Sequence, residues 1–203
     1  MNRVEINMED RIAGYISNKL RAGGVIDPEY EEVYKYGLEL VLSFLFSTAV
    51  IIAVGAAIGK LLPALVFLAV FISVRRFTGG YHADTYLKCK LTTVSVYLIV
   101  SAASSLFDVG YAAFIICAVT GLAVILLFAP IENPNKPLTT KSKRRNRIIG
   151  LVFYESLVCA AEVFVKIDHS VSDTICFSLF SILFLMIFAI FKGRRKCKNE
   201  KDR

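Results

Sequence analysis

Long apolar runs constrain the fold of this chain more than any other feature. One of them, "LVLSFLFSTAVIIAVGAAIG" at residues 40–59, contains no charged side chain. A helix of about 20 apolar residues is long enough to cross a bilayer. Because lipid offers no hydrogen bonds to the backbone, such runs must be helical. With 56% hydrophobic residues in total, the sequence predicts an all-α, polytopic integral membrane protein.

We expect about six transmembrane helices, preceded by an amphipathic helix over residues 1–24. In that first segment apolar residues recur every fourth position, among charges that prevent it from crossing the membrane. Asp27 and Pro28 are typical of a helix start. The second span is only 14 residues long, which indicates tilt or a re-entrant path. The expected spans are residues 37–58, 61–74, 91–107, 110–129, 148–165 and 174–191.

The basic residues indicate the orientation of these spans. Of 24 Lys and Arg residues, only Lys60 and Lys166 fall in the expected outer loops. Cytoplasmic loops are enriched in Lys and Arg. We therefore expect both termini and the loops 75–90 and 130–147 to be cytoplasmic, in a multi-pass protein of the cell membrane. Membrane orientation also accounts for the net charge of +7, so no nucleic-acid partner is expected.

Polar chemistry gathers in the loop "RRFTGGYHADTYLKCK", residues 75–90. A cysteine nucleophile needs a base, and His82 is the only histidine expected on the same side as Cys89. The other histidine, His169, falls in an outer loop. In one straight helix, residues seven apart would be separated by about 10.5 Å, so the chain must bend between His82 and Cys89 or pair across protomers. We expect Cys89 at the start of the next span.

Neighbouring residues have alternative roles. The amides around Gly79 and Gly80, at a flexible break, are candidates to hold an oxyanion. Asp84 either orients the imidazole or balances nearby lysines, and Arg75 either anchors the topology or pairs with a substrate carboxylate. An ordinary structural loop remains the competing interpretation. The five cysteines lack metal-ligand spacing and no nucleotide motif is present, so neither a metal nor a cofactor is expected. Cysteines 117, 159 and 176 fall in apolar runs and should be buried.

The loop at residues 130–147 begins with prolines that disfavour a helix through its first half. Its second half carries a dense group of basic residues. They either contact anionic lipids, as in an ordinary cytoplasmic loop, or bind an acidic partner. The basic residues are Lys141, Lys143, Arg144, Arg145 and Arg147.

Arg75, the Gly-x-His pattern of Gly80 and His82, and Cys89 resemble the accessory gene regulator protein B family. The membrane layout and the chain length are similar too. The family consists of membrane cysteine endopeptidases of Gram-positive quorum sensing. The resemblance implies a pro-peptide substrate with an amphipathic leader and an acidic C-terminal tail. It also implies catalysis by His82 and Cys89 through an acyl-enzyme, ring closure to a thiolactone or lactone, a homodimer and no cofactor.

Two non-enzymatic alternatives remain at this point. Six spans suffice for a small transporter or peptide exporter, and the amphipathic helix suits a scaffold protein. Glu155 and Glu162 lie seven apart on one helical face, where they form either a functional polar stripe or inter-helix contacts. Loss of pro-peptide cleavage on replacing Cys89 or His82, with normal membrane insertion, would separate these alternatives.

Overall fold

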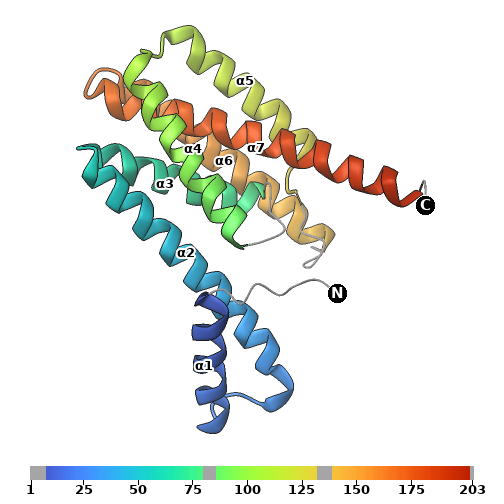
Figure 1. The fold of residues 1–203 in the computed structure, drawn as a ribbon. Helices are drawn as coiled ribbons and strands as arrows, with labels where there is room; N and C mark the ends of the chain where they lie inside the picture. The colour runs from blue at the N-terminus through green and yellow to red at the C-terminus, as the bar shows by residue number, and fades with distance from the viewer. Residues whose placement is uncertain (1–7, 80–85, 132–138, 202–203) are drawn as a thin grey trace. The chain divides into compact units, whose positions relative to one another are not determined.

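The computed structural model describes residues 8–79, 86–131 and 139–201, and these segments are almost entirely helical (Figure 1). One isolated bridge, between Gly79 and Ile131, is the only β pairing among them. The predicted all-α class is confirmed. The helices are α1 (Met8–Ala22), α2 (Glu31–Ala57), α3 (Leu61–Thr78), α4 (Tyr86–Leu106), α5 (Tyr111–Phe128), α6 (Thr140–Phe164) and α7 (His169–Lys201), with a 3₁₀ turn at Pro28–Tyr30.

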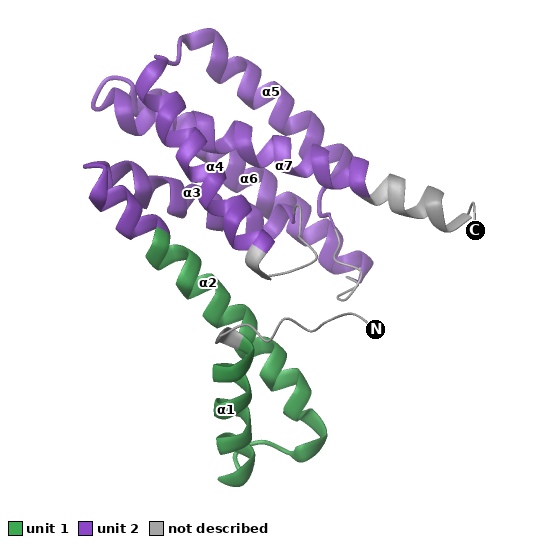
Figure 2. Ribbon diagram, viewed as in Figure 1, with its two compact units in different colours: residues 1–50 green, residues 51–203 purple. Residues whose placement is uncertain are grey.

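The helices divide into two compact units, residues 1–50 and 51–203 (Figure 2). The first unit holds α1 and most of α2. Its two helices are joined by ion pairs between Asp10 and Lys35, at 2.6 Å, and between Arg21 and Glu31, at 3.0 Å. The expected amphipathic helix is therefore present from Met8, while residues 1–7 lie outside the described part of the chain.

The start of α2 follows the pattern expected from its sequence. The Asp27 side chain accepts a hydrogen bond from the backbone N–H of Glu29 at 3.0 Å, and Pro28 takes the first position of the 3₁₀ turn. This cap satisfies a backbone donor that has no partner within the helix. The turn leads directly into α2, so one continuous helical segment enters the apolar run.

Five helices of the described chain are long and apolar enough to cross a membrane, and the protein is a membrane protein. The second expected span proves longer than its apolar run, because α3 continues through Arg75 and Arg76 to Thr78. At 1.5 Å per residue its 18 residues extend about 27 Å. The five segments are Pro28–Ala57, Leu61–Thr78, Lys88–Leu106, Tyr111–Phe128 and His169–Lys192.

The expected span at residues 148–165 differs from these five. It belongs to α6, whose apolar half carries the charges of Arg147, Glu155 and Glu162 and is therefore less apolar than the other helices. Nevertheless α6 packs within the second unit against α3, α5 and α7. Gly150, Tyr154, Val158 and Ala161 form its buried face, so protein contacts cover one face of this helix.

The core of the second unit lies around α7, which contacts α3, α4, α5 and α6. Polar residues of α7 enter this core with their hydrogen bonds made internally: the Ser172 hydroxyl donates to the Ala161 carbonyl at 2.7 Å, for example. Helices α5 and α6 approach each other closely at Gly121, where a Cβ atom would overlap the ring of Tyr154 from α6. The Tyr154 hydroxyl lies 3.0 Å from the Cys117 sulfur.

Candidate functional site

The end of α3 contacts the start of the segment that leads to α6. The backbone N–H of Ile131 donates to the Thr78 carbonyl at 2.9 Å, and Gly79 forms its β bridge with Ile131. Gly79 has φ of 72°, and a Cβ atom there would overlap the Ile131 backbone. The two polar segments predicted to share one side of the membrane therefore meet at this point.

Gly79 was expected to provide flexibility, and the structure corrects this interpretation. Its positive φ is a conformation that L side chains rarely adopt, and the space for a side chain is filled by Ile131. The glycine is needed for close backbone approach. Sequence patterns do not reveal this pairing, because it joins the backbones of residues 52 positions apart.

Side chains reinforce the same junction. The Arg147 guanidinium donates from Nε to the Ala129 carbonyl, at 2.7 Å, at the C-terminal end of α5. The rings of Phe77 and Phe153 stack with centroids 5.5 Å apart. A Cβ at Gly150 would lie 3.0 Å from the Thr78 methyl group, so the start of α6 packs tightly on the end of α3. These contacts fix α3, α5 and α6 to one another beside the candidate site.

Cys89 lies in the first turns of α4, as expected for the start of the third span, and is half-buried. Its carbonyl accepts a hydrogen bond from the Thr93 hydroxyl at 3.0 Å. The charge of Arg75 interacts electrostatically with the Cys89 thiol. Because Arg75 ends the preceding helix, the turn of the chain brings a cation to the candidate nucleophile.

Arg75 is itself half-buried, and its Cζ atom lies 5.0 Å from the centroid of the Phe71 ring. Such cation–π contact restrains the guanidinium. Arg76, in contrast, is exposed and lies over Phe77. The Phe71 contact thus orients the Arg75 guanidinium, the charge of which interacts with Cys89.

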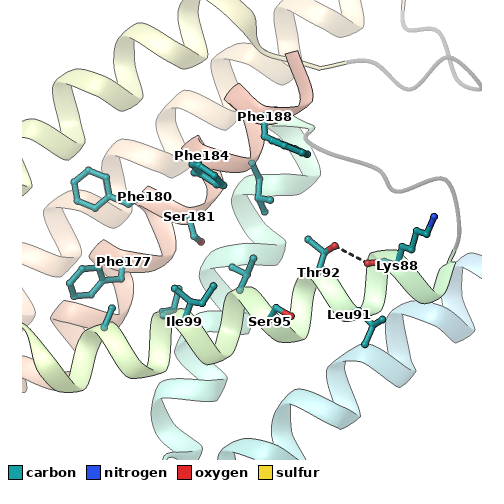
Figure 3. Close-up of a pocket in the computed structure, with 14 residues that line it drawn as sticks. Lys88, Leu91, Thr92, Ser95, Ile99, Phe177, Phe180, Ser181, Phe184 and Phe188 are labelled. Atoms are coloured by element: carbon teal, nitrogen blue, oxygen red, sulfur yellow. Dashed lines mark hydrogen bonds between the residues drawn. The ribbon is translucent and has the colours of Figure 1, made fainter. Parts of the chain in front are cut away.

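Three predicted site residues, Gly80, His82 and Asp84, lie outside the described residues, so the pairing of His82 with Cys89 stays a prediction. The other histidine, His169, is the first residue of α7. A groove between α4 and α7 is lined by Lys88 and Phe188, and both lie away from its Phe177 end (Figure 3). Along α7, His169 is separated from Phe188 by 19 residues, or about 28 Å. His169 is therefore remote from Cys89.

The five basic residues of the second polar segment occupy the first two turns of α6, where Thr139 caps the helix by accepting a hydrogen bond from the Ser142 N–H. Lys141, Arg144 and Arg145 are exposed, and Lys143 is half-buried. Arg147 differs, because it bonds to the α5 carbonyl. The positive end of the helix dipole adds to the exposed charges, which makes this turn attractive to anions.

The cysteines other than Cys89 differ in their burial. Cys117 and Cys176 are buried as expected, whereas Cys159 is exposed on α6 and that expectation was wrong. The apolar run alone did not show which face of α6 packs on its neighbours. No group of three or more His, Cys, Asp or Glu residues suited to hold a metal occurs in the described segments.

The family model "Accessory gene regulator B" matches residues 9–191 of this chain. The chain belongs to the accessory gene regulator B family. It is 27% identical over 145 residues to a putative AgrB-like protein 2 of Clostridium perfringens, covering 68% of both chains. Over 155 residues it is 26% identical to a putative AgrB-like protein of Halalkalibacterium halodurans, covering 75% of this chain and 77% of that one.

Accessory gene regulator protein B of Staphylococcus epidermidis is 24% identical over 88 residues, covering 43% of this chain and 45% of its own. No solved structure matches the chain. Membership of the accessory gene regulator B family implies a role in quorum sensing. The predicted family is thereby confirmed.

Proposed function

We propose that this family member is a membrane cysteine endopeptidase that removes the acidic C-terminal tail of a quorum-sensing pro-peptide and closes the remainder into a ring. The observation that carries the proposal is the position of Cys89: it lies half-buried at the start of α4, and the charge of Arg75 interacts with it electrostatically. A thiol near a fixed cation at a membrane surface is suited to nucleophilic attack.

The reaction proceeds in two acyl transfers. His82 takes the proton of Cys89, the sulfur attacks the carbonyl at the tail junction, and the C–N bond breaks as His82 protonates the leaving amine. The product is a thioester on Cys89. An internal cysteine of the peptide then attacks this carbonyl and releases Cys89, giving a thiolactone; a serine would give a lactone. Exchange of one thioester for another is close to isoenergetic, so exclusion of water is essential.

The substrate is recognised, in this proposal, by charge at one end and by the membrane at the other. The exposed basic residues at the start of α6 bind the acidic tail, and the bilayer holds the amphipathic leader, which raises the effective concentration of the peptide. The stacking of Phe77 on Phe153 and the close approach of Thr78 to Gly150 hold α6 close to the end of α3, which supports an arrangement of tail-binding and reacting groups in one region. The functional unit is a homodimer.

Replacing Cys89 by Ala or His82 by Ala should each abolish cleavage of an acidic-tailed pro-peptide in vesicles. Cys159→Ala is the matched control, because this exposed thiol of α6 has no proposed role. Mass spectrometry should find the peptide attached through a thioester to Cys89 in the unaltered chain. Cleavage that persists in Cys89→Ala with normal membrane insertion would refute the proposed function.

A further inference from the structure

A groove of about 830 Å³ runs between α4 and α7 in the second unit (Figure 3). On α4 it extends from Lys88 to Ala103, and on α7 from Phe177 to Phe188. The volume is typical of a ligand site, for which about 300–1,000 Å³ is usual. Because both helices are candidate membrane spans, the groove lies along the direction in which they cross the bilayer.

The chemistry of the groove suits a hydrocarbon chain. Aromatic rings from α7 line one side, and Phe184 is 68% exposed there. The hydroxyl of Thr92 donates to the Lys88 carbonyl, and that of Ser181 donates to the Ser178 carbonyl, both at 2.7 Å. These two hydroxyl protons are used within their own helices, and Ser95 is the third hydroxyl that lines the groove. An extended peptide has a donor and an acceptor at almost every residue, so it would leave most of its polar groups unsatisfied in this apolar lining.

The length of the groove also fits an acyl chain. Lys88 and Ala103 are 15 residues apart on α4, which corresponds to about 22 Å. The hydrocarbon layer of one leaflet is about 15 Å deep, half of the bilayer core. The groove is thus longer than the hydrocarbon layer of one leaflet is deep. An acyl chain that enters from the Lys88 end can therefore lie in the groove along the whole length of the chain.

Charge distinguishes one end of this groove from the rest. Among the described residues that line it, Lys88 is the only charged one, and it begins the membrane-spanning part of α4. Its position is therefore at the level of lipid headgroups. A lysine at this level attracts anionic phosphates electrostatically. The residue that follows Lys88 is the candidate nucleophile, Cys89.

We propose that the groove between α4 and α7 binds an anionic phospholipid, with one acyl chain along the helices and the headgroup phosphate at Lys88. The lipid comes from the leaflet that meets the Cys89 end of α4. Its bound headgroup sets the charge beside Cys89, so the membrane composition acts on the candidate site. Lipid binding itself does not require the proposed peptidase reaction, and its test stands apart from cleavage.

The chain contains no tryptophan, so a single introduced one reports on its surroundings. Ile99→Trp places a reporter in the groove, and Leu98→Trp is a control at nearly the same depth on another face of α4. Each full-length variant is placed in phosphatidylcholine vesicles in which a minor fraction is either brominated phosphatidylglycerol or brominated phosphatidylcholine. Bromine quenches only a tryptophan that the labelled chain contacts.

We expect brominated phosphatidylglycerol to occupy the groove with about a fivefold preference at the Ile99→Trp reporter. Leu98→Trp should show no such preference. Adding Lys88→Gln should remove the preference, while Lys90→Gln, with the same change in net charge two residues away, should leave it. Leu91→Trp provides a second groove reporter should Ile99→Trp fail to insert.

Two results would overturn the proposal. Equal quenching by both brominated lipids in the groove would mean ordinary boundary lipid without selection. Protection from both would mean that protein, such as a second copy of the chain, covers the groove. Neither result would bear on cleavage by Cys89, and loss of cleavage in Cys89→Ala would not bear on lipid selection.

Discussion

Arg75, Thr78 and Gly79 all lie at the end of α3, and each contributes a different interaction. The Arg75 charge acts on Cys89, the Thr78 carbonyl accepts a hydrogen bond from Ile131, and Gly79 allows the backbones to approach. Arg75 was a candidate site residue through its side chain and Gly79 through its amide, whereas Thr78 was not a candidate. Thr78 and Gly79 act through backbone atoms, so residue type alone does not indicate their partner.

Gly79→Ala tests the close approach, and Gly59→Ala is its matched control. Both glycines have positive φ, of 72° and 70°, but no atom lies within 4 Å of a Cβ at Gly59. Gly59→Ala should cost only the backbone strain of about 1–2 kcal/mol. Gly79→Ala should cost more, because a methyl group also overlaps the Ile131 backbone. Thermal unfolding in detergent measures both; equal losses would contradict the role assigned to Ile131.

Two arginines at the start of α6 have different surroundings. Arg147 reaches the end of α5 through its Nε atom, whereas Arg145 is exposed two residues earlier. Their spacing places both in the basic cluster recognised from the sequence. Only the packing of α6 against α5 separates a structural contact from a charge available to a ligand.

Arg145→Gln and Arg147→Gln should therefore have different effects. Removing Arg147 leaves the Ala129 carbonyl without this donor and should cost about 1–3 kcal/mol in stability. Arg145→Gln should leave the unfolding temperature unchanged and weaken the binding of an acidic tail peptide. Thermal unfolding and peptide binding at low salt measure the two quantities. Equal peptide affinity of Arg145→Gln and the unaltered chain would argue against tail binding at this turn.

Ion pairs contribute to the pairing of α1 with α2, in addition to the burial of Ala13 and Ser17 on α1. The hydrogen bond from Lys35 holds the pKa of Asp10 below its ordinary value of 3.8. A carboxylate with a lowered pKa contributes stability above its unfolded pKa, and this contribution is lost as pH falls through the folded pKa. The α1–α2 contact should thus be intact at neutral pH and weaken below about pH 3.8.

Charge reversal tests the same contact at neutral pH. Asp10→Lys should separate α1 from α2, and the double variant with Lys35→Asp should restore the pair. Distances between spin labels on exposed positions of the two helices report the change. Glu29→Lys, at an exposed residue with no ion pair among the described ones, is the control. A double variant no better than Asp10→Lys alone would exclude this ion pair as the connection.

For the molecule as a whole, the number of membrane crossings depends on whether α6 crosses the bilayer. In the part of the chain that the structure describes, five helices are apolar enough to cross by themselves. Helix α6 packs against α3, α5 and α7 and carries Glu155 and Glu162. An even number of crossings puts both termini on one side, and an odd number puts them on opposite sides. We predict six crossings, with α6 crossing as a part of the bundle.

Single cysteines at residues 3 and 201, in a chain otherwise free of cysteine, allow this prediction to be tested. A thiol reagent that cannot pass the membrane should label both positions from the cytoplasmic side of inverted vesicles, and neither in intact cells. A single cysteine at Lys166, expected outside, should show the reverse pattern. Labelling of the two termini from opposite sides would exclude six crossings.

The sequence by itself determined the class of this protein, because apolar runs of membrane-spanning length can satisfy their backbone only as helices. It also indicated the family, through Arg75, Gly80, His82 and Cys89, because a local motif can be recognised in the sequence without knowing how the helices pack. Tertiary structure decided which charges are used internally, as for Arg147, and where backbones meet, as for Gly79 and Ile131. It also produced the groove between α4 and α7. These features depend on contacts between distant segments, which no local pattern of residue types records.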